Sequence, residues 1–314
     1  MYSAKNGNAT EEKPAIPLYI SRAYRGIILF EGGITMKFTK MHGCGNDYVY
    51  VNCFEEKVND PVNLSIKISD RHKGIGADGL ILILPTPNAD AFMQLYNSDG
   101  SSDTMCGNGI RCVAKYVYEH GIVPPDKTTL TIDTPVGMRT LYLTVDDSGK
   151  VSSVRVNMGK GTATTPIPDN ITVHDMALKF IGINVGNDHA VYFVEDNPII
   201  RDILTWPDSK FAVEGDYFEK HEYFPKRVNS EFIEVLSRRE INMRVYERGS
   251  GETMACGTGT TASVFAGVVS GKLDRNADVT VHLRGGDLVI HVDDDDTCWM
   301  TGPAVEVFTG EYQE

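Results

Sequence analysis

Apolar and polar residues alternate along much of this chain in short runs, a spacing typical of half-buried β-strands. The first such run is Met36 to Met41. Further along, two pairs of runs flank the polar turns Asp146 to Gly149 and Arg284 to Asp287, and each pair predicts a hairpin. The flanking runs are residues 140–145 with 154–158 and residues 279–283 with 288–292. A mainly antiparallel sheet structure is therefore expected.

Two segments carry a helical spacing instead, and both begin at a cysteine. After Cys106 and after Cys256, apolar residues recur at the i, i+3, i+4 and i+7 positions of an amphipathic helix. These residues are Ile110, Val113, Ala114 and Val117 in the first segment and Ala262, Phe265, Ala266 and Val269 in the second. Gly121 and Gly271 each follow their cysteine by fifteen residues, where a left-handed helix C-cap is expected. Many strands with few helices predict the fold class α+β.

The two cysteine segments form an internal repeat. Cys106-Gly-Asn-Gly returns 150 residues later as Cys256-Gly-Thr-Gly, and a strand-like run precedes each motif. A repeat of about half the chain predicts two pseudo-symmetric domains. The expected division is an N-terminal domain over residues 36–150, a C-terminal domain over residues 151–299, and a last strand within 300–314 that returns to the N-terminal domain. Residues 1–35 are interpreted as an N-terminal extension.

Composition and charge exclude several classes of function. The chain has 314 residues, of which 41% are hydrophobic and 23% charged, and its formal net charge is −13. No cluster of Lys and Arg could hold a phosphate backbone, so nucleic-acid binding is not expected. No apolar run reaches the roughly 18 to 20 residues of a membrane-spanning helix, and the N-terminus lacks signal-peptide character. These properties fit a cytoplasmic enzyme that acts on a small molecule, and a homodimer is compatible with them.

The six cysteines invite a disulfide or metal interpretation, but no two show the C-x-x-C spacing of redox or zinc sites. Free thiols in a reducing compartment are expected. Structural positions are assigned to Cys44, Cys53, Cys112 and Cys298. The carboxylates Asp293 to Asp296 lack the spaced ligands of a calcium loop. Gly74 to Gly79 matches the dinucleotide-binding pattern G-x-G-x-x-G. A helix-like run, residues 62–72, precedes it and a strand-like run, residues 80–84, follows it, which reverses the order that this pattern requires. Neither a metal nor a nucleotide is therefore expected.

A Cys-Gly-x-Gly segment at the start of a helix offers an anion site and an activated thiol. The first-turn amides have no partner within the helix, and glycine lets a ligand approach them closely. The helix dipole also favours a thiolate over a thiol. Two such segments, one from each domain, can address opposite faces of the same carbon.

This pattern predicts inversion of an amino-acid α-carbon, with Cys106 and Cys256 as opposed acid and base. The substrate carboxylate would lie between the two helix N-termini, where charge that develops during the reaction is stabilised. No pyridoxal phosphate or other cofactor is then required. We expect domain closure over the substrate, because the reaction must exclude water.

Several blocks, in order, make the chain resemble the diaminopimelate epimerases from about Met36 to the C-terminus. The blocks are residues 40–47 (KMHGCGND), 96–100 (YNSDG), 105–112 (MCGNGIRC), 186–189 (GNDH), 244–253 (RVYERGSGET) and 255–259 (ACGTG). The resemblance implies that each domain is a mostly antiparallel, barrel-like sheet around a central helix, with the active site in the cleft between the domains. It also implies cofactor-independent interconversion of LL- and meso-diaminopimelate, in lysine and peptidoglycan precursor synthesis.

The resemblance further implies roles for single residues. Besides the two cysteines, Glu247 and His189 would lie beside the thiols. The carboxylate at the reacting end would be held by backbone amides of Gly107, Asn108, Gly257 and Thr258. The unreacting amino-acid end would be bound by Asn46, Asn97, Asn187, Asn229 and Arg248, and Glu247 would also contact the substrate.

Three positions depart from the family pattern. Asp188 stands where proline is usual, Gly79 where some members have glutamine, and Cys44 where an aliphatic residue is common. Two alternative functions remain open at this point. A two-cysteine racemase of proline, hydroxyproline or histidine would use the same thiols, although such proteins tend to carry histidine at the position of Asn108. A redox-responsive or metal-binding protein would use the six cysteines instead.

Overall fold

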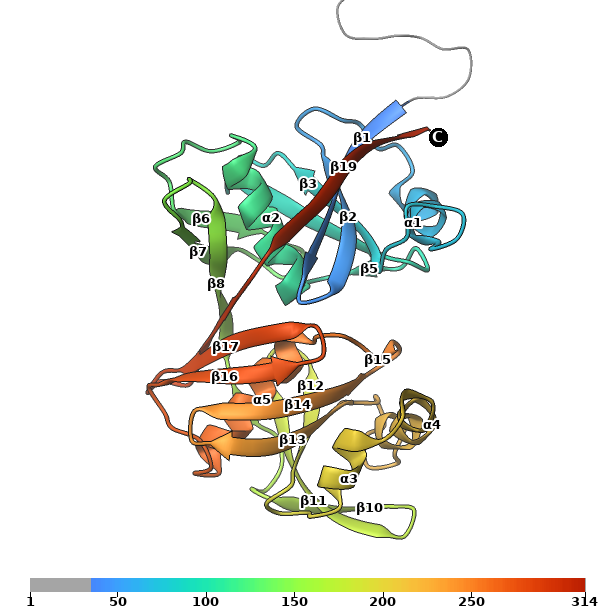
Figure 1. Ribbon diagram of the computed structural model, residues 1–314, viewed down its shortest axis with the longest axis vertical. Coiled ribbons are helices and arrows are strands. Elements are labelled where there is room, and N and C mark those ends of the chain that lie inside the picture. The colour runs from blue at the N-terminus through green and yellow to red at the C-terminus, as the bar shows by residue number, and fades with distance from the viewer. Residues whose placement is uncertain (1–34, 314) are drawn as a thin grey trace, which may run out of the picture.

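The computed structural model describes residues 35–313, which form two halves, each a sheet wrapped on a helix (Figure 1). The predicted α+β class is confirmed, since strands predominate and only five helices occur among the described residues. The extension predicted for residues 1–35 lies outside the described residues, apart from Thr35, where the first strand begins.

The elements of the first half are β1 (Thr35–Gly43), β2 (Asn46–Asn52), α1 (Pro61–Ser69), β3 (Gly79–Leu84), β4 (Ala91–Asn97), β5 (Ser102–Asp103), α2 (Gly107–Glu119), β6 (Thr129–Asp133), β7 (Arg139–Val145) and β8 (Val151–Lys160). Those that follow are β9 (Thr162–Ala163), β10 (Asp169–Val173), β11 (Met176–Asn184), β12 (Asp188–Phe193), α3 (Ile200–Thr205), α4 (Asp208–Glu219), β13 (Asn229–Ser237), β14 (Glu240–Glu247), β15 (Gly251–Glu252), α5 (Gly257–Val269), β16 (Asp278–Leu283), β17 (Gly286–Val292), β18 (Thr297–Gly302) and β19 (Val305–Gln313).

The pairing of the strands repeats between the halves. In the first half β2 runs parallel to β3, β3 antiparallel to β4, and β4 parallel to β6. In the second half β12, β13, β14 and β16 pair in the same way. Most other pairs are antiparallel, as in the predicted hairpins β7–β8 and β16–β17. The internal repeat of the sequence is therefore also a repeat of topology.

The two halves exchange strands at their junction. β8 pairs with β7 of the first half and also with β18 of the second half. After β8 the chain forms β9, which pairs with β11, and after β18 it forms β19, which returns to pair with β1 (Figure 1). The chain thus crosses between the halves twice. After β8 it enters the second half as β9, and after β18 it returns to the first half as β19.

One helix lies inside each sheet. The apolar stripe predicted for α2 is buried, with Ile110, Val113 and Val117 fully covered, and α5 is buried through most of its length. Sheet residues surround both helices in one continuous apolar core, which is why the helices keep fixed positions. The two predicted helix ends are also present, because Gly121 and Gly271 have φ of 69° and 73°, the left-handed conformation of a C-cap.

The remaining helices lie on the outside of the sheets. α1 covers a small apolar cluster on the first half, and α3 and α4 cover an aromatic-rich cluster on the second (Figure 1). In that second cluster Phe218 meets Phe232 edge-on with ring centroids 5.0 Å apart. These outer helices therefore bury the apolar outer faces of the strands beneath them.

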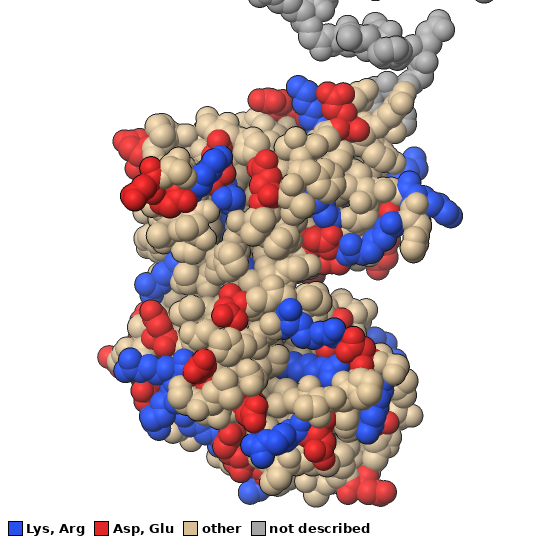
Figure 2. Space-filling view, in the orientation of Figure 1, with Lys and Arg blue, Asp and Glu red and all other residues tan. Residues whose placement is uncertain are grey.

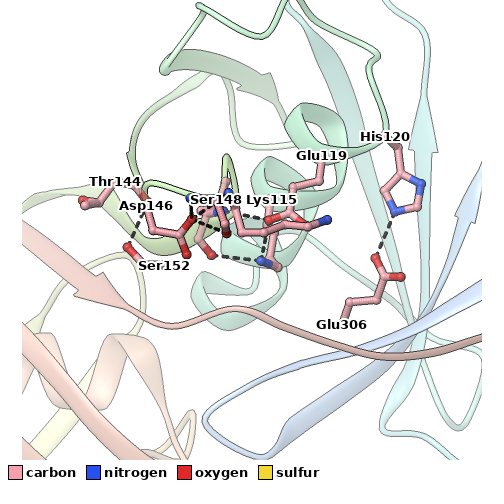
Figure 3. Close-up of polar contacts among 10 residues, drawn as sticks. Lys115, Glu119, His120, Thr144, Asp146, Ser148, Ser152 and Glu306 are labelled. Atoms are coloured by element: carbon pink, nitrogen blue, oxygen red, sulfur yellow. Dashed lines mark hydrogen bonds and ion pairs between the residues drawn. The ribbon is translucent and has the colours of Figure 1, made fainter.

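Polar contacts tie the far end of α2 to the strands around it (Figure 3). Lys115 Nζ lies 2.6 Å from Glu119 Oε1, and that carboxylate accepts the Val151 N–H of β8 at 2.7 Å. His120 Nε2 lies 2.9 Å from Glu306 Oε2 on β19. Because α2 is held at this end, its N-terminus is fixed in direction toward the other half.

The surface carries both signs of charge. Acidic and basic side chains are interspersed on the face drawn in Figure 2, whose outline narrows between the two halves. Within residues 35–313, none of the helices combines the length and apolarity needed to span a membrane.

Candidate active site

Cys106 and Cys256 occupy the same position at the start of the two inner helices. Each is the N-cap residue in an extended conformation, with φ and ψ of −126° and 115° for Cys106 and −115° and 112° for Cys256. Each sulfur accepts the N–H of the residue three positions on, Gly109 or Gly259, at 3.3 Å. The sulfur therefore takes the place of the oxygen of a usual capping side chain.

The two helix N-termini approach each other closely. A Cβ added to Gly257 would lie 3.6 Å from Cα of Gly107, and Met300 packs against both glycines. Asn108 Nδ2 donates to the carbonyl of Ala255, next to Cys256, at 3.0 Å. The structure thus brings together the two repeated motifs, and a Cβ at Gly107 would lie 2.9 Å from Met300 Cε, so that the methionine would have to shift.

Cys106 lies among polar groups of the first half. Its Sγ is 3.3 Å from Asn46 Oδ1, and Asn108 Nδ2 lies 3.4 Å from the same oxygen. Asn46 Nδ2 donates to Asp78 at 2.7 Å, which fixes its amide plane. Burial raises the pKa of the Cys106 thiol, and hydrogen bonds from Gly109 N–H and the Tyr48 hydroxyl lower that pKa by less.

Cys256 lies beside carboxylates of the second half. Burial, followed by the charges of Glu247 and Glu231, holds the pKa of the Cys256 thiol well above its ordinary value. Thr258 Oγ1 is 3.5 Å from the sulfur. Burial also raises the pKa of Glu247, whose carboxylate accepts a hydrogen bond from the Thr253 hydroxyl. Glu247 is thus beside a thiol, where the sequence predicts it.

His189 is fully enclosed and has a partner on each ring nitrogen. Nδ1 lies 2.7 Å from Glu231 Oε1, and Nε2 lies 2.8 Å from Asn187 Oδ1. Burial raises the pKa of Glu231, while His189 lowers it by less. His189 therefore positions Asn187, and the hydrogen bonds of its ring nitrogens go to Glu231 and Asn187 rather than to a sulfur.

Asn229 and Arg248 meet at the ends of neighbouring strands. Asn229 Oδ1 accepts the backbone N–H of Arg248 at 2.7 Å, so the amide NH₂ of Asn229 stays available. The Arg248 guanidinium contacts only the carbonyl of Lys226, at 3.5 Å, and forms no ion pair with any described residue. An exposed guanidinium and an amide donor together suit a carboxylate ligand.

The remaining predicted position, Asn97, lies at the end of β4. It is aligned with Gly79 across the sheet, and its amide donates to Ser101 Oγ at 3.1 Å. A Cβ on Gly79 would lie 2.2 Å from the Tyr96 carbonyl, so the backbone leaves no room there for a side chain such as glutamine. Asp188 is exposed and accepts from Asn184 at 2.7 Å, and it leaves the Asn187–His189 contact intact.

The halves touch each other around the thiols. A Cβ on Gly45 would lie 3.0 Å from Met254 Cβ, and one on Gly285 would lie 1.8 Å from the Cys44 carbonyl. All six cysteines are free thiols. Within the part of the chain that the structure describes, no three His, Cys, Asp or Glu side chains are grouped to hold a metal ion.

Two buried charged residues of this region were not predicted from the sequence as functional. Glu231 is fully buried, and its second oxygen has no hydrogen-bond partner. Arg111 is fully buried at the first turns of α2. A signal existed for Glu231, because Asn229 and Glu231 are two residues apart in a strand and so share a face.

Comparison with known proteins gives consistent matches. A family model described as diaminopimelate epimerase matches the chain twice, over residues 38–164 and 181–307. Relatives of that name include a protein of Agathobacter rectalis, 50% identical over 295 residues, which cover 88% of this chain and 99% of the relative. Another, from Acetivibrio thermocellus, is 46% identical over 293 residues, with coverage of 88% and 98%.

Solved structures match at lower identity. A hydroxyproline epimerase from Agrobacterium vitis superposes with a TM-score of 0.64 at 14% identity, over 89% of this chain and 92% of its own. A Bacillus anthracis phenazine biosynthesis protein of the PhzF family gives 0.66 at 14% identity, over 90% and 100%. At such identities the likeness concerns the fold alone, which the two inner helices and their sheets define.

Proposed function

This chain belongs to the diaminopimelate epimerase family, and from that premise we propose that it interconverts LL- and meso-diaminopimelate with Cys106 and Cys256 as the two acid–base groups. The observation that supports the proposal is the close approach of two helix N-termini, each of which has a cysteine as its N-cap residue. It is an isomerase, and its product serves lysine biosynthesis.

The reaction requires one thiolate and one thiol. The thiolate takes the α-proton from one face of the carbon, and the electron pair left on that carbon is delocalised into the adjacent carboxylate. The opposite thiol then gives its proton to the other face. Inversion is complete, the two sulfurs have exchanged protonation states, and neither an oxidant nor a cofactor enters the balance.

Backbone amides stabilise the charge that builds on the carboxylate. The first-turn N–H groups of Gly107, Asn108, Gly257 and Thr258 have no partner within their helices. Both helix dipoles direct their positive ends to the same place. Donors fixed in an enclosed site stabilise developing charge with little reorganisation, which lowers the barrier to removal of a weakly acidic proton.

The unreacting end of the substrate distinguishes diaminopimelate from smaller amino acids. Arg248 and the amides of Asn187 and Asn229 offer donors to a second carboxylate, and Asn46 and Asn97 are assigned to the same end of the substrate. Proline has no such end and would leave these groups unpaired, which costs binding energy. Family membership favours the epimerase over the proline, hydroxyproline or histidine racemase.

Proton exchange tests the proposal directly. We expect LL-diaminopimelate incubated with the protein in deuterated water to lose its α-proton and to yield the meso isomer, as followed by NMR. Cys106→Ala and Cys256→Ala should each abolish turnover, since removing either thiol leaves one face without its group. L-proline is the control substrate, and exchange into proline alone would refute the assignment.

We infer that residues 36–150 with the returning β19, and residues 151–299, are the two domains that move apart to admit the substrate. The contacts between Gly45 and Met254 close the junction in the present structure, so entry requires an opening there. We also infer a cytoplasmic location, because six free thiols suit a reducing compartment.

A homodimer through the β1–β19 face is part of the same proposal. Among the described strands, β19 pairs only with β1, and Val305, Val307 and Phe308 on it are 40%, 53% and 46% exposed. Hollows of about 320 and 510 Å³ flank it, lined in part by α2. An unpaired strand edge with apolar side chains is a natural place for a second copy to pair.

A further inference from the structure

Arg111 is a buried cation without an anionic partner. Its side chain is fully enclosed, and within residues 35–313 its guanidinium forms no ion pair. Its hydrogen bonds go to the carbonyls of Pro303 and Gly107, each at 3.2 Å, and to Met300 Sδ at 3.5 Å, while Nη2 has no partner. A buried charge left uncompensated is costly, so its retention calls for an explanation.

Two glycines make the space for this guanidinium. A Cβ on Gly43 would lie 2.8 Å from Nη2, and one on Gly302 would lie 2.4 Å from Leu288 Cδ2 and 3.1 Å from Nε. Neither glycine has the left-handed φ that would otherwise require glycine. The absence of a side chain at both glycines therefore leaves room for the guanidinium of Arg111.

The contact with Gly107 links Arg111 to the proposed carboxylate site. The Gly107 carbonyl and the Asn108 N–H belong to one peptide unit, and that N–H is among the donors assigned to the carboxylate. A charged donor on the carbonyl polarises the unit and strengthens its N–H as a donor. Arg111 also lies near the N-terminus of α2, where its charge adds to the positive end of the helix dipole rather than opposing it.

The second half provides an internal comparison. Thr261 occupies the position equivalent to Arg111, and its Oγ1 donates to the Gly257 carbonyl at 2.8 Å. Both halves therefore place a side-chain donor on the carbonyl of the first helical residue. Only the first half uses a charged donor, so the two sides of the site are not electrostatically equal.

We propose that Arg111 is a positioning residue for the reaction, a buried guanidinium that acts through the Gly107–Asn108 peptide to stabilise the carboxylate as it gains charge. The inference rests on the proposed function, because it needs an anion between the helix N-termini. Substrate binding then brings a carboxylate near the uncompensated guanidinium. Their attraction strengthens as the α-proton leaves, because the carboxylate then gains charge.

Arg111→Met tests this inference, since methionine fills similar space without the charge. We expect kcat/KM for α-proton exchange of LL-diaminopimelate to fall about 10²- to 10³-fold, a loss typical of a removed oxyanion donor. The loss should be mainly in kcat, because the carboxylate gains charge only during the reaction. Arg111→Lys should recover part of the rate, and the melting temperature of Arg111→Met should stay level or rise.

Thr261→Val is the matched control, and we expect it to lower kcat/KM by no more than about tenfold, as for one neutral hydrogen bond. The inference is overturned if Thr261→Val costs as much as Arg111→Met, or if the methionine variant keeps its rate or loses it together with its melting temperature. A wild-type protein without exchange activity would instead overturn the proposed function, so the two failures are distinguishable.

Discussion

Glu247 is the charged group that the two thiols share. Its carboxylate raises the pKa of both Cys106 and Cys256, in each case as an addition to the larger effect of burial. A raised thiol pKa means that less thiolate is present at neutral pH, so activity should increase as pH rises through that pKa. The carboxylate therefore adds to the effect of burial in raising the pH at which a thiolate base becomes available.

Glu247→Gln should shift the rise of activity with pH, the alkaline limb of the pH profile, to lower pH. Without the negative charge the thiolate is less disfavoured, so the thiol pKa falls and the limb follows it. The maximal rate should drop about 10²-fold, as for a lost acid–base partner. The measurement is kcat/KM for α-proton exchange across neutral and alkaline pH. Glu240→Gln, at the other end of β14, is the control, and a limb that moves equally in both variants would contradict the assignment.

At the residue scale, the sequence predicted the functional groups that belong to motifs. It did not predict those whose burial depends on the tertiary structure. Cys106, Cys256 and their glycines could be found because the motif repeats. Arg111 could not, since a charged residue in a helix ordinarily faces solvent, and for Glu231 the only signal was the strand face that it shares with Asn229. The partner of His189 likewise depends on the pairing of β12 with β13.

At the element scale, the inner helices and the outer helix α1 were predictable from the sequence, whereas the outer helices α3 and α4 were not. α2 and α5 carry regular apolar spacing and are followed by a glycine, whereas Pro207 separates α3 from α4, and Gly215 within α4 lowers the helix propensity of that segment. α4 also buries only one side, against an aromatic cluster contributed by distant strands. The parallel pairing of β2 with β3 could not be predicted either, because the periodicity of a strand does not show which other strand it pairs with.

Gly215 offers a test of how α4 packs. A Cβ at this position would lie 2.1 Å from Tyr246 Cδ2 on β14. Alanine ordinarily stabilises a helix relative to glycine, but here we expect Gly215→Ala to lower the free energy of unfolding by about 1–3 kcal/mol through overpacking.

Chemical denaturation measures the difference. Val213→Ala, at a position of the same helix that is 60% exposed, should change stability by less than about 0.5 kcal/mol. A Gly215→Ala variant as stable as the wild type would mean that α4 does not sit against Tyr246.

At the scale of the whole molecule, the assembly proposed for the β1–β19 face can be measured. We expect light scattering after size exclusion to give a dimer for the wild type and a monomer for Phe308→Asp, because a charge would be buried in the interface. Leu236→Asp, at an exposed position of the second half, should remain dimeric. A monomeric wild type, or a dimeric Phe308→Asp, would contradict the proposed face.

The exchange of strands between the halves bears on how such a molecule could have arisen. A single ancestral unit, equivalent to residues 36–150, would lack the strand that β19 now supplies to β1 and would leave that edge bare. Two identical units could each have lent this strand to the other, as in domain swapping. Gene duplication and fusion would then have converted a symmetric pair into one chain, after which Arg111 and Thr261 were free to become different.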